Sequence, residues 1–124
     1  TGEQEISSYR DLKVWQAAMM IAERSYLATR SFPREEQFGL TSQIRRSAAS
    51  IAANIAEGHG RETTGAFIQF LRTAQGSTKE LETHLLLAQR VEILDAAAAD
   101  RLLSSAEEIG KMLRALIRSL ERKG

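Results

Sequence analysis

Cysteine is absent from this sequence, and proline occurs once in its 124 residues, at Pro33. Without cysteine the chain has no disulfide framework, no thiolate metal site and no cysteine nucleophile. A single proline argues against an all-β domain, because such a domain needs a turn about every 8–12 residues. The longest apolar run, Ala17–Ala22, is far shorter than the ~20 residues of a membrane span. These absences favour a helical protein of the cytoplasm that has no membrane partner.

A surplus of charge of one sign is also missing, since 17 basic and 16 acidic residues leave a formal net charge of +1. The net charge therefore does not indicate a class of partner, and any binding of nucleic acid must depend on local clusters of basic residues. The length suits one domain and is short of two. We expect residues 1–8 to be a disordered or vector-derived tail and residues 9–124 to form a single helical domain.

Four segments carry apolar side chains at steps of three and four residues, a spacing typical of amphipathic helices. They cover about residues 11–30, 33–57, 63–91 and 95–122. Pro33 suits the first turn of the second helix, and Asp95 suits the N-cap of the fourth. Because the connections are short, the simplest fold is an all-α, antiparallel up-down-up-down four-helix bundle. The stripe of the first helix, with Trp15 and Tyr26 on it, is expected to pack in the core.

The positions of the glycines predict one helix cap and one close packing contact. Gly58 or Gly60, at the end of the second segment, is free to adopt a left-handed cap. Gly76 lies in the middle of the third, where glycine costs about 1 kcal/mol relative to alanine, so a packing reason is expected.

The residues that usually carry chemistry do not form a recognisable constellation. His59 and His84 lie far apart in the sequence, and no second Glu-x-x-His pair exists for a metal site in a bundle. Adjacent carboxylates on a helix point apart, which argues against an acid–base pair. We therefore expect no catalytic residues, no metal and no cofactor.

Basic residues cluster in two places. In the fourth segment they follow steps of three, four and four, which places them within about an 80° arc: Lys111, Arg114, Arg118 and Arg122. This stripe is able to meet phosphates, or it is a solvated face that complements the helix dipole. In the second segment Arg45 and Arg46 are candidates for the same role, or for ion pairs. No exposed aromatic residue is predicted among basic groups, so binding is expected to use the nucleic-acid backbone with little sequence selectivity.

The sequence of residues 38–58 is FGLTSQIRRSAASIAANIAEG. It resembles a four-helix bundle family that was first noted as reading frames in 23S ribosomal RNA intervening sequences and is also called the S23 family. Leu12-x-Val14-Trp15 and the stretch from Phe70 to Glu82 agree with it. The resemblance implies a left-handed antiparallel bundle, assembly into a homopentamer and no catalytic activity. It also implies a relation to a nucleic-acid-binding retroelement accessory protein. Ala52 departs from the proline common in the family, which predicts a straighter second helix.

Polar residues beside the buried stripe of the second segment are more numerous than a solvated face needs. A head-to-tail ring joins two different faces of each subunit, and small or hydrogen-bonding side chains suit such a contact. The predicted interface comprises Thr41, Ser42, Gln43, Ser47, Ser50, Asn54 and Glu57.

These residues lead to one main hypothesis, a pentameric homo-oligomer that binds RNA or DNA through clustered arginine and lysine. The alternative is an oligomeric structural adaptor that recruits a protein and does not bind nucleic acid. A third hypothesis, an enzyme with a small-molecule pocket, requires a carboxylate or histidine cluster in a cleft.

Overall fold

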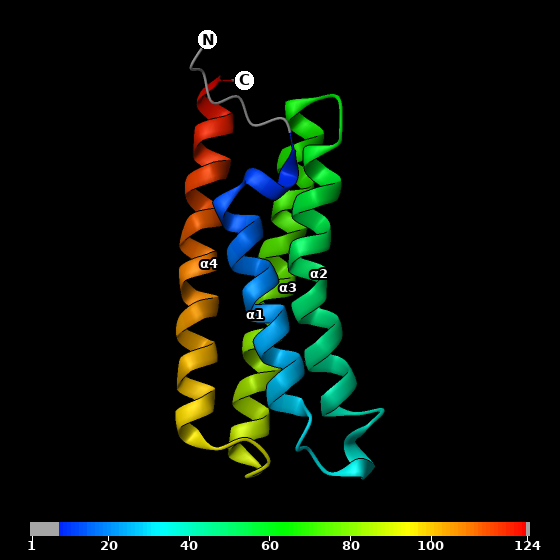
Figure 1. Cartoon of the computed structure of the whole chain (residues 1–124). Helices are drawn as coiled ribbons and strands as arrows, with labels where there is room; N and C mark the ends of the chain where they lie inside the picture. The colour runs from blue at the N-terminus through cyan, green and yellow to red at the C-terminus, as the bar shows by residue number, and fades with distance from the viewer. Residues whose placement is uncertain (1–7, 124) are drawn as a thin grey trace.

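The computed structural model describes residues 8–123 and contains four long helices with no strand among those residues. Figure 1 shows that successive helices run in opposite directions, and that α1 and α3 each lie beside α2 and α4. The predicted all-α class is therefore confirmed, while the handedness of the bundle stays a prediction. The expectation of a tail falls mostly on residues 1–7, which lie outside the described residues. The helices are α1 (Lys13–Thr29), α2 (Leu40–His59), α3 (Thr64–Arg90) and α4 (Ala96–Lys123).

The core lies along the axis of the bundle and is built from branched aliphatic side chains. Each of them is worth roughly 1.5–3 kcal/mol when it is fully buried rather than exposed. Alanines between them, such as Ala48 and Ala106, let the helices approach closely. The largest completely buried apolar side chains are Ile21, Ile44, Ile51, Ile55, Leu71, Leu81, Leu85, Ile109 and Leu113.

Two predicted helix starts are capped by side chains. The Thr63 hydroxyl accepts a hydrogen bond from the amide of Ala66 (3.1 Å), and the Asp95 carboxylate accepts one from the amide of Ala98 (2.8 Å). These caps confirm the starts of α3 and α4. Ser8 caps a one-turn 3-10 helix, η1 (Tyr9–Asp11), rather than α1, because Leu12 is extended and separates the two.

The second helix does not begin at Pro33, so that prediction was wrong. Pro33 precedes a one-turn 3-10 helix, η2 (Arg34–Glu36), and α2 begins only at Leu40. The backbone of Gly39 is not helical (φ −108°, ψ −116°). The Glu36 carboxylate folds back to accept a hydrogen bond from the Leu40 amide (3.0 Å). A Cβ atom at Gly39 would lie 2.7 Å from that carboxylate oxygen, so glycine leaves room for this cap.

The two expectations for glycine were also wrong. Gly58 lies inside α2, and Gly60 has a right-handed backbone (φ −80°), so neither forms a left-handed cap. A Cβ atom at Gly58 would lie 2.6 Å from Cβ of Phe70, and glycine is needed there because α3 passes so close. Gly76 has no such reason, since a Cβ atom built there has no heavy atom of the described chain within 4 Å beyond its own surroundings.

Candidate functional site

The four basic residues predicted on α4 are all exposed and follow one side of the helix. Arg114 and Arg118 border hollows between α3 and α4, of about 350 Å³ and 220 Å³, which share Gln75 and Arg114. Lys111 lies 3.7 Å from the Glu108 carboxylate. Among residues 8–123 no carboxylate is within ion-pair distance of Arg114, Arg118 or Arg122. We call Lys111, Arg114, Arg118 and Arg122 the α4 cationic stripe.

The arginine pair of α2 is divided between two environments. Nε of Arg45 donates a hydrogen bond to the Thr29 hydroxyl (2.8 Å), and its guanidinium carbon lies 4.7 Å from the ring centroid of Tyr26. Arg45 therefore joins α2 to α1 through a hydrogen bond and a cation–π contact. Arg46 is exposed and points away from that contact. Of this pair, only Arg46 is open to a phosphate without loss of contacts inside the chain.

The six predicted nucleic-acid-binding residues do not form one site within a single chain. Arg45 lies beside Tyr26 and Thr29, near the C-terminal end of α1. Helix α2 packs against α1 and α3, whereas α4 is on the opposite side of the bundle (Figure 1). The α4 cationic stripe also extends along the helix toward the other end of the bundle, over a rise of about 16 Å from Lys111 to Arg122.

The polar residues predicted at a subunit interface find most of their partners inside the chain. The Ser50 and Ser77 hydroxyls are 2.8 Å apart and connect α2 to α3. The Asn54 amide donates to the carbonyl of Ser50 (2.8 Å), and the Ser47 hydroxyl donates to that of Gln43 (2.7 Å). Glu57 pairs with Arg61 at 2.8 Å. Thr41 and Ser42 are half-buried and Gln43 is exposed. Their role at an interface stays a prediction, but a neighbour is not needed to explain this polarity.

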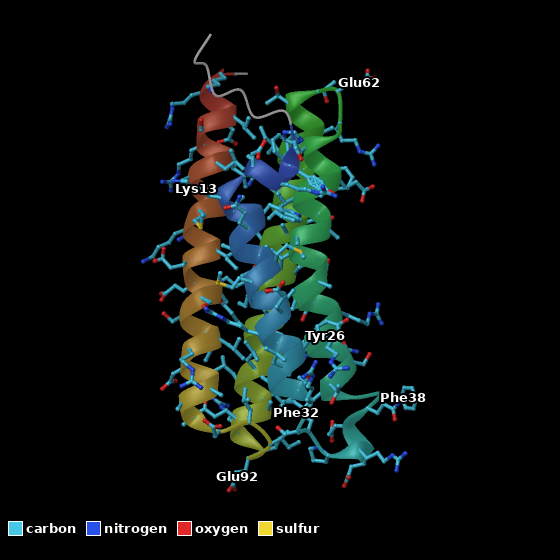
Figure 2. All side chains as sticks on the ribbon, viewed as in Figure 1. Lys13, Tyr26, Phe32, Phe38, Glu62 and Glu92 are labelled. Atoms are coloured by element: carbon cyan, nitrogen blue, oxygen red, sulfur yellow. The ribbon has the colours of Figure 1, made fainter. Side chains whose placement is uncertain are left out.

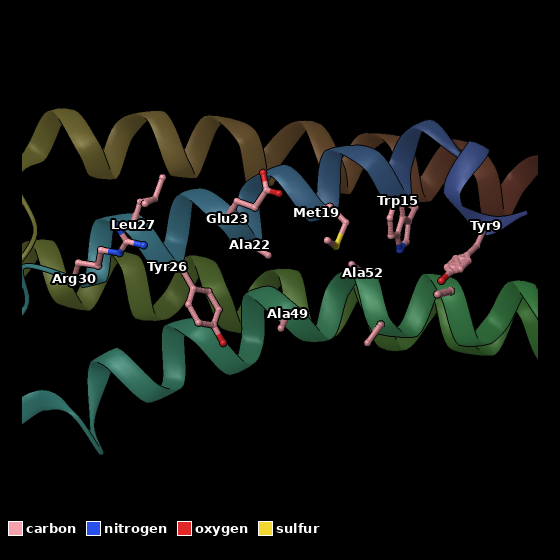
Figure 3. A pocket seen from close by; sticks show the side chains of 12 residues that line it. Tyr9, Trp15, Met19, Ala22, Glu23, Tyr26, Leu27, Arg30, Ala49 and Ala52 are labelled. Atoms are coloured by element: carbon pink, nitrogen blue, oxygen red, sulfur yellow. The ribbon is translucent and has the colours of Figure 1, made fainter.

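The feature that the sequence did not reveal is an apolar groove of about 720 Å³ between α1 and α2, the α1–α2 groove (Figure 3). Its walls include Trp15, Met19 and Tyr26, and four alanines of α2 lie along it: Ala49, Ala52, Ala53 and Ala56. The ring of Tyr9 meets Trp15 edge to face at 5.2 Å and lines one end.

The assignment of the α1 stripe to the core is confirmed for Ala18 and Ala22, and Trp15 packs against the core, but it was wrong for Tyr26. Tyr26 is 46% exposed and Met19 is 37% exposed, so the stripe continues out of the core and into the groove. One signal was available in the sequence, because the four alanines recur at steps of three, one and three, which places them on one flank of α2. The charged residues of the lining are Glu23 and Arg30.

The two histidines are placed apart. His59, at the end of α2, meets the ring of Phe67 edge to face at 5.8 Å, and His84 is half-buried on α3. No group of three metal-ligating side chains occurs in residues 8–123. Within the same residues, none of the helices has the length and apolar character needed to cross a bilayer.

The fold and these surfaces define the chain as an all-helical four-helix bundle protein with an apolar groove and a cationic stripe. A sequence model of the 23S rRNA-intervening sequence protein family matches residues 10–115. The chain belongs to this family, which confirms the resemblance seen in residues 38–58.

A solved structure supports the same relation. It is a crystal structure of a protein with unknown function from the S23 ribosomal protein family of Bacteroides thetaiotaomicron, to which this chain is 28% identical. The alignment covers 84% of this chain and 97% of that chain, with a TM-score of 0.76. None of the curated proteins matches this sequence.

Proposed function

We propose that this protein is a homo-oligomer, a pentamer by its resemblance, that binds RNA or DNA through the phosphate backbone. The main support for the proposed nucleic-acid binding is the α4 cationic stripe. Arg114, Arg118 and Arg122 are exposed, and no carboxylate of residues 8–123 neutralises them. An unpaired guanidinium group keeps its donors available, and a phosphate accepts two of them at once.

The arrangement suits a nucleic-acid backbone better than base edges. The cations lie along one helix with a rise of about 6 Å between Arg114 and Arg118 and again between Arg118 and Arg122. Trp15 packs against the ring of Tyr9 and Phe67 against that of His59, while Tyr26 and Phe70 each lie against an arginine, Arg45 and Arg61. Contacts to phosphates fix position without reading sequence, so binding with little sequence preference follows. Several copies around an axis would add their fields and strengthen the attraction.

Support for self-association comes from the α1–α2 groove. Monomeric proteins seldom leave a large apolar hollow open to water, and such surfaces mark sites of interaction. The half-exposed Met19 and Tyr26 would lose contact with water in an assembly. The flanking alanines leave space for a neighbour's side chains.

The test is the double variant R114E/R118E, assayed for retention of a mixed-sequence RNA and of a DNA duplex across a salt series. We expect wild-type binding to weaken steeply as salt rises, and the variant to bind at least tenfold more weakly at low salt with an unchanged oligomeric mass. The matched control is R90E/R101E, which makes the same change in charge at two exposed arginines away from the stripe.

Equal losses in both double variants would show that total charge, and not the α4 cationic stripe, governs binding. If wild-type protein retains neither RNA nor DNA at low salt, the binding proposal is wrong. An adaptor that recruits a protein partner then becomes the better account, since the apolar α1–α2 groove is suited to a protein.

A further inference from the structure

The turn between α1 and α2 presents one aromatic ring to water. Phe38 is 88% exposed, the largest exposure among the large apolar residues described, and it projects away from the bundle (Figure 2). The turn that carries it is well defined. The Glu36 amide donates to the Pro33 carbonyl (2.9 Å), the Gly39 amide donates to the Glu36 carbonyl (3.0 Å), and Phe32 is buried beneath. An exposed phenyl ring on a hydrogen-bonded turn is available for an apolar contact with another surface.

The same chain carries an apolar space that Phe38 does not fill. The α1–α2 groove is lined mainly by apolar side chains, and Phe38 is not among its lining residues. A projection and a hollow at different places on one chain favour a heterologous contact between copies, in which each copy gives its projection to the next. Such a contact closes into a ring when the rotation between copies allows it.

Both surfaces carry one acid and one base, so two ion pairs between them are chemically possible. Near Phe38 the turn carries Arg34 and Glu35, and the groove is lined at its charged positions by Glu23 and Arg30. All four groups are exposed, and none forms an ion pair among residues 8–123. A turn seated in the groove would place one acid and one base on each side of the contact. Phe38 is also a lone ring without a contiguous apolar patch on its turn, which suits insertion into a pocket better than docking of a flat surface.

We infer that Phe38 of one copy inserts into the α1–α2 groove of a neighbouring copy and thereby sets a head-to-tail assembly. This inference depends on the proposed homo-oligomer and adds the two surfaces that meet. It also moves the contact from Ser47, Ser50 and Asn54 to another flank of α2, where Ala49 and Ala53 are exposed. The occupant of the groove is then a second copy of this chain.

Because the sequence contains no cysteine, single cysteines report the contact directly. We expect the variant F38C/A49C to form, on oxidation, a ladder of covalent oligomers that ends at the size of the ring. Each single variant alone should give no covalent dimer, and an equal mixture of F38C and A49C should give a dimer only. A bond within one chain would leave the mass of a single chain, so its product is distinguished by size from the ladder of covalent oligomers.

Two results would overturn the contact. Under this inference F38C alone does not cross-link to itself, so self-cross-linking at the rate of the mixture would place two Phe38 rings together. A double variant that does not cross-link, while light scattering still shows the assembly, would place the interface elsewhere and leave the proposed oligomer standing. A wild-type protein that is a single chain at micromolar concentration would instead remove the homo-oligomer itself.

A second measurement separates a subunit contact from a nucleic-acid contact. We expect F38S to raise the dissociation constant of the assembly at least tenfold, while Q37S, on the same exposed turn, leaves it unchanged and far-ultraviolet circular dichroism shows both variants folded. Mixing F38S with A49R should restore a dimer, because the intact Phe38 of one fits the intact groove of the other. If F38S keeps its assembly and loses RNA binding tenfold, Phe38 contacts nucleic acid and the inference is wrong.

Discussion

The groove between α1 and α2 and the surface between α3 and α4 are built on the same packing of antiparallel helices, yet they differ in chemistry. The first is lined by Trp15, Met19, Tyr26 and a flank of alanines. The second is lined largely by charged and amide side chains, and the Arg72–Glu121 ion pair (3.0 Å) spans it. The difference shows that the core of a bundle constrains only the inward stripe of each helix. The flanks are left to determine what the surface meets.

The two surfaces therefore suit different partners. An apolar hollow gains free energy from covering, in proportion to the apolar area removed from water. A row of exposed cations gains little from burial and much from a polyanion that stays partly solvated. On one scaffold the first surface favours protein neighbours and the second favours phosphates.

The largest expected effect is on assembly. The variant A53R places a long cation in the α1–α2 groove, where desolvation of its charge opposes contact with a neighbour. We expect light scattering to report the mass of a single chain, 13.8 kDa, at micromolar concentration. The matched variant Q75R, on the α3–α4 side, should keep the wild-type mass. Equal behaviour of the two would mean that the comparison of the surfaces is not a guide to assembly.

The next effect is on the salt dependence of nucleic-acid binding. Replacing Arg118 or Arg122 with glutamine should each lower the slope of log K against log salt by about 1, the value for one lost phosphate contact. R45Q should leave the slope unchanged, because Arg45 is bonded to Thr29 and Tyr26 within the chain. Filter binding of one RNA at four or more salt concentrations measures these slopes. A change of slope in R45Q alone would place the contact on α2.

A smaller effect concerns the α2–α3 contact that holds both surfaces in one frame. G58A introduces a methyl group 2.6 Å from Cβ of Phe70, and such overpacking costs about 1–3 kcal/mol of unfolding free energy. G76A, on an exposed face with open space around it, should instead gain about 0.5–1 kcal/mol from helix propensity. Urea unfolding of both variants measures the difference. Stabilisation by G58A would mean that the helices separate easily at this point.

The smallest effect is expected from the ion pair between α3 and α4. The side chains of Arg72 and Glu121 are each half-exposed, so solvent screens the pair and its contribution is about 0–1 kcal/mol. A double-mutant cycle with R72A and E121A measures this coupling by urea unfolding. A coupling well above that range would show that the pair is structural rather than part of a solvated charged surface.

Much of the fold followed from local patterns. The cap at Asp95 was predicted because an oxygen acceptor at an N-cap serves amides only two or three residues away. The core isoleucines and leucines were predicted because the helical period places them on one side. The start of α2 was not predicted correctly. Both Pro33 and the Glu36 cap can begin a helix, and the fold of the turn at Gly39 decides that α2 begins after the Glu36 cap.

The candidate surfaces were predictable to different degrees. The α4 cationic stripe follows from spacing alone, because all four residues are long, charged and opposite the apolar side of one helix. The α1–α2 groove required two helices to be placed side by side, and Met19 and Tyr26 look like core residues until that placement leaves them half-exposed. The partners of Ser50 and Arg45 lie 27 and 16 positions away in the sequence, and no local pattern predicts them.

The local sequence determines the four amphipathic helices, their order and their inward faces, because hydrophobic periodicity and capping act within a few residues. The roles of Gly58, Arg45 and Phe38 arise only when distant segments meet. The close approach of α3 at Gly58, the hydrogen bond of Arg45 to α1 and the exposure of Phe38 all depend on how distant segments pack, so they are defined only in the packed bundle.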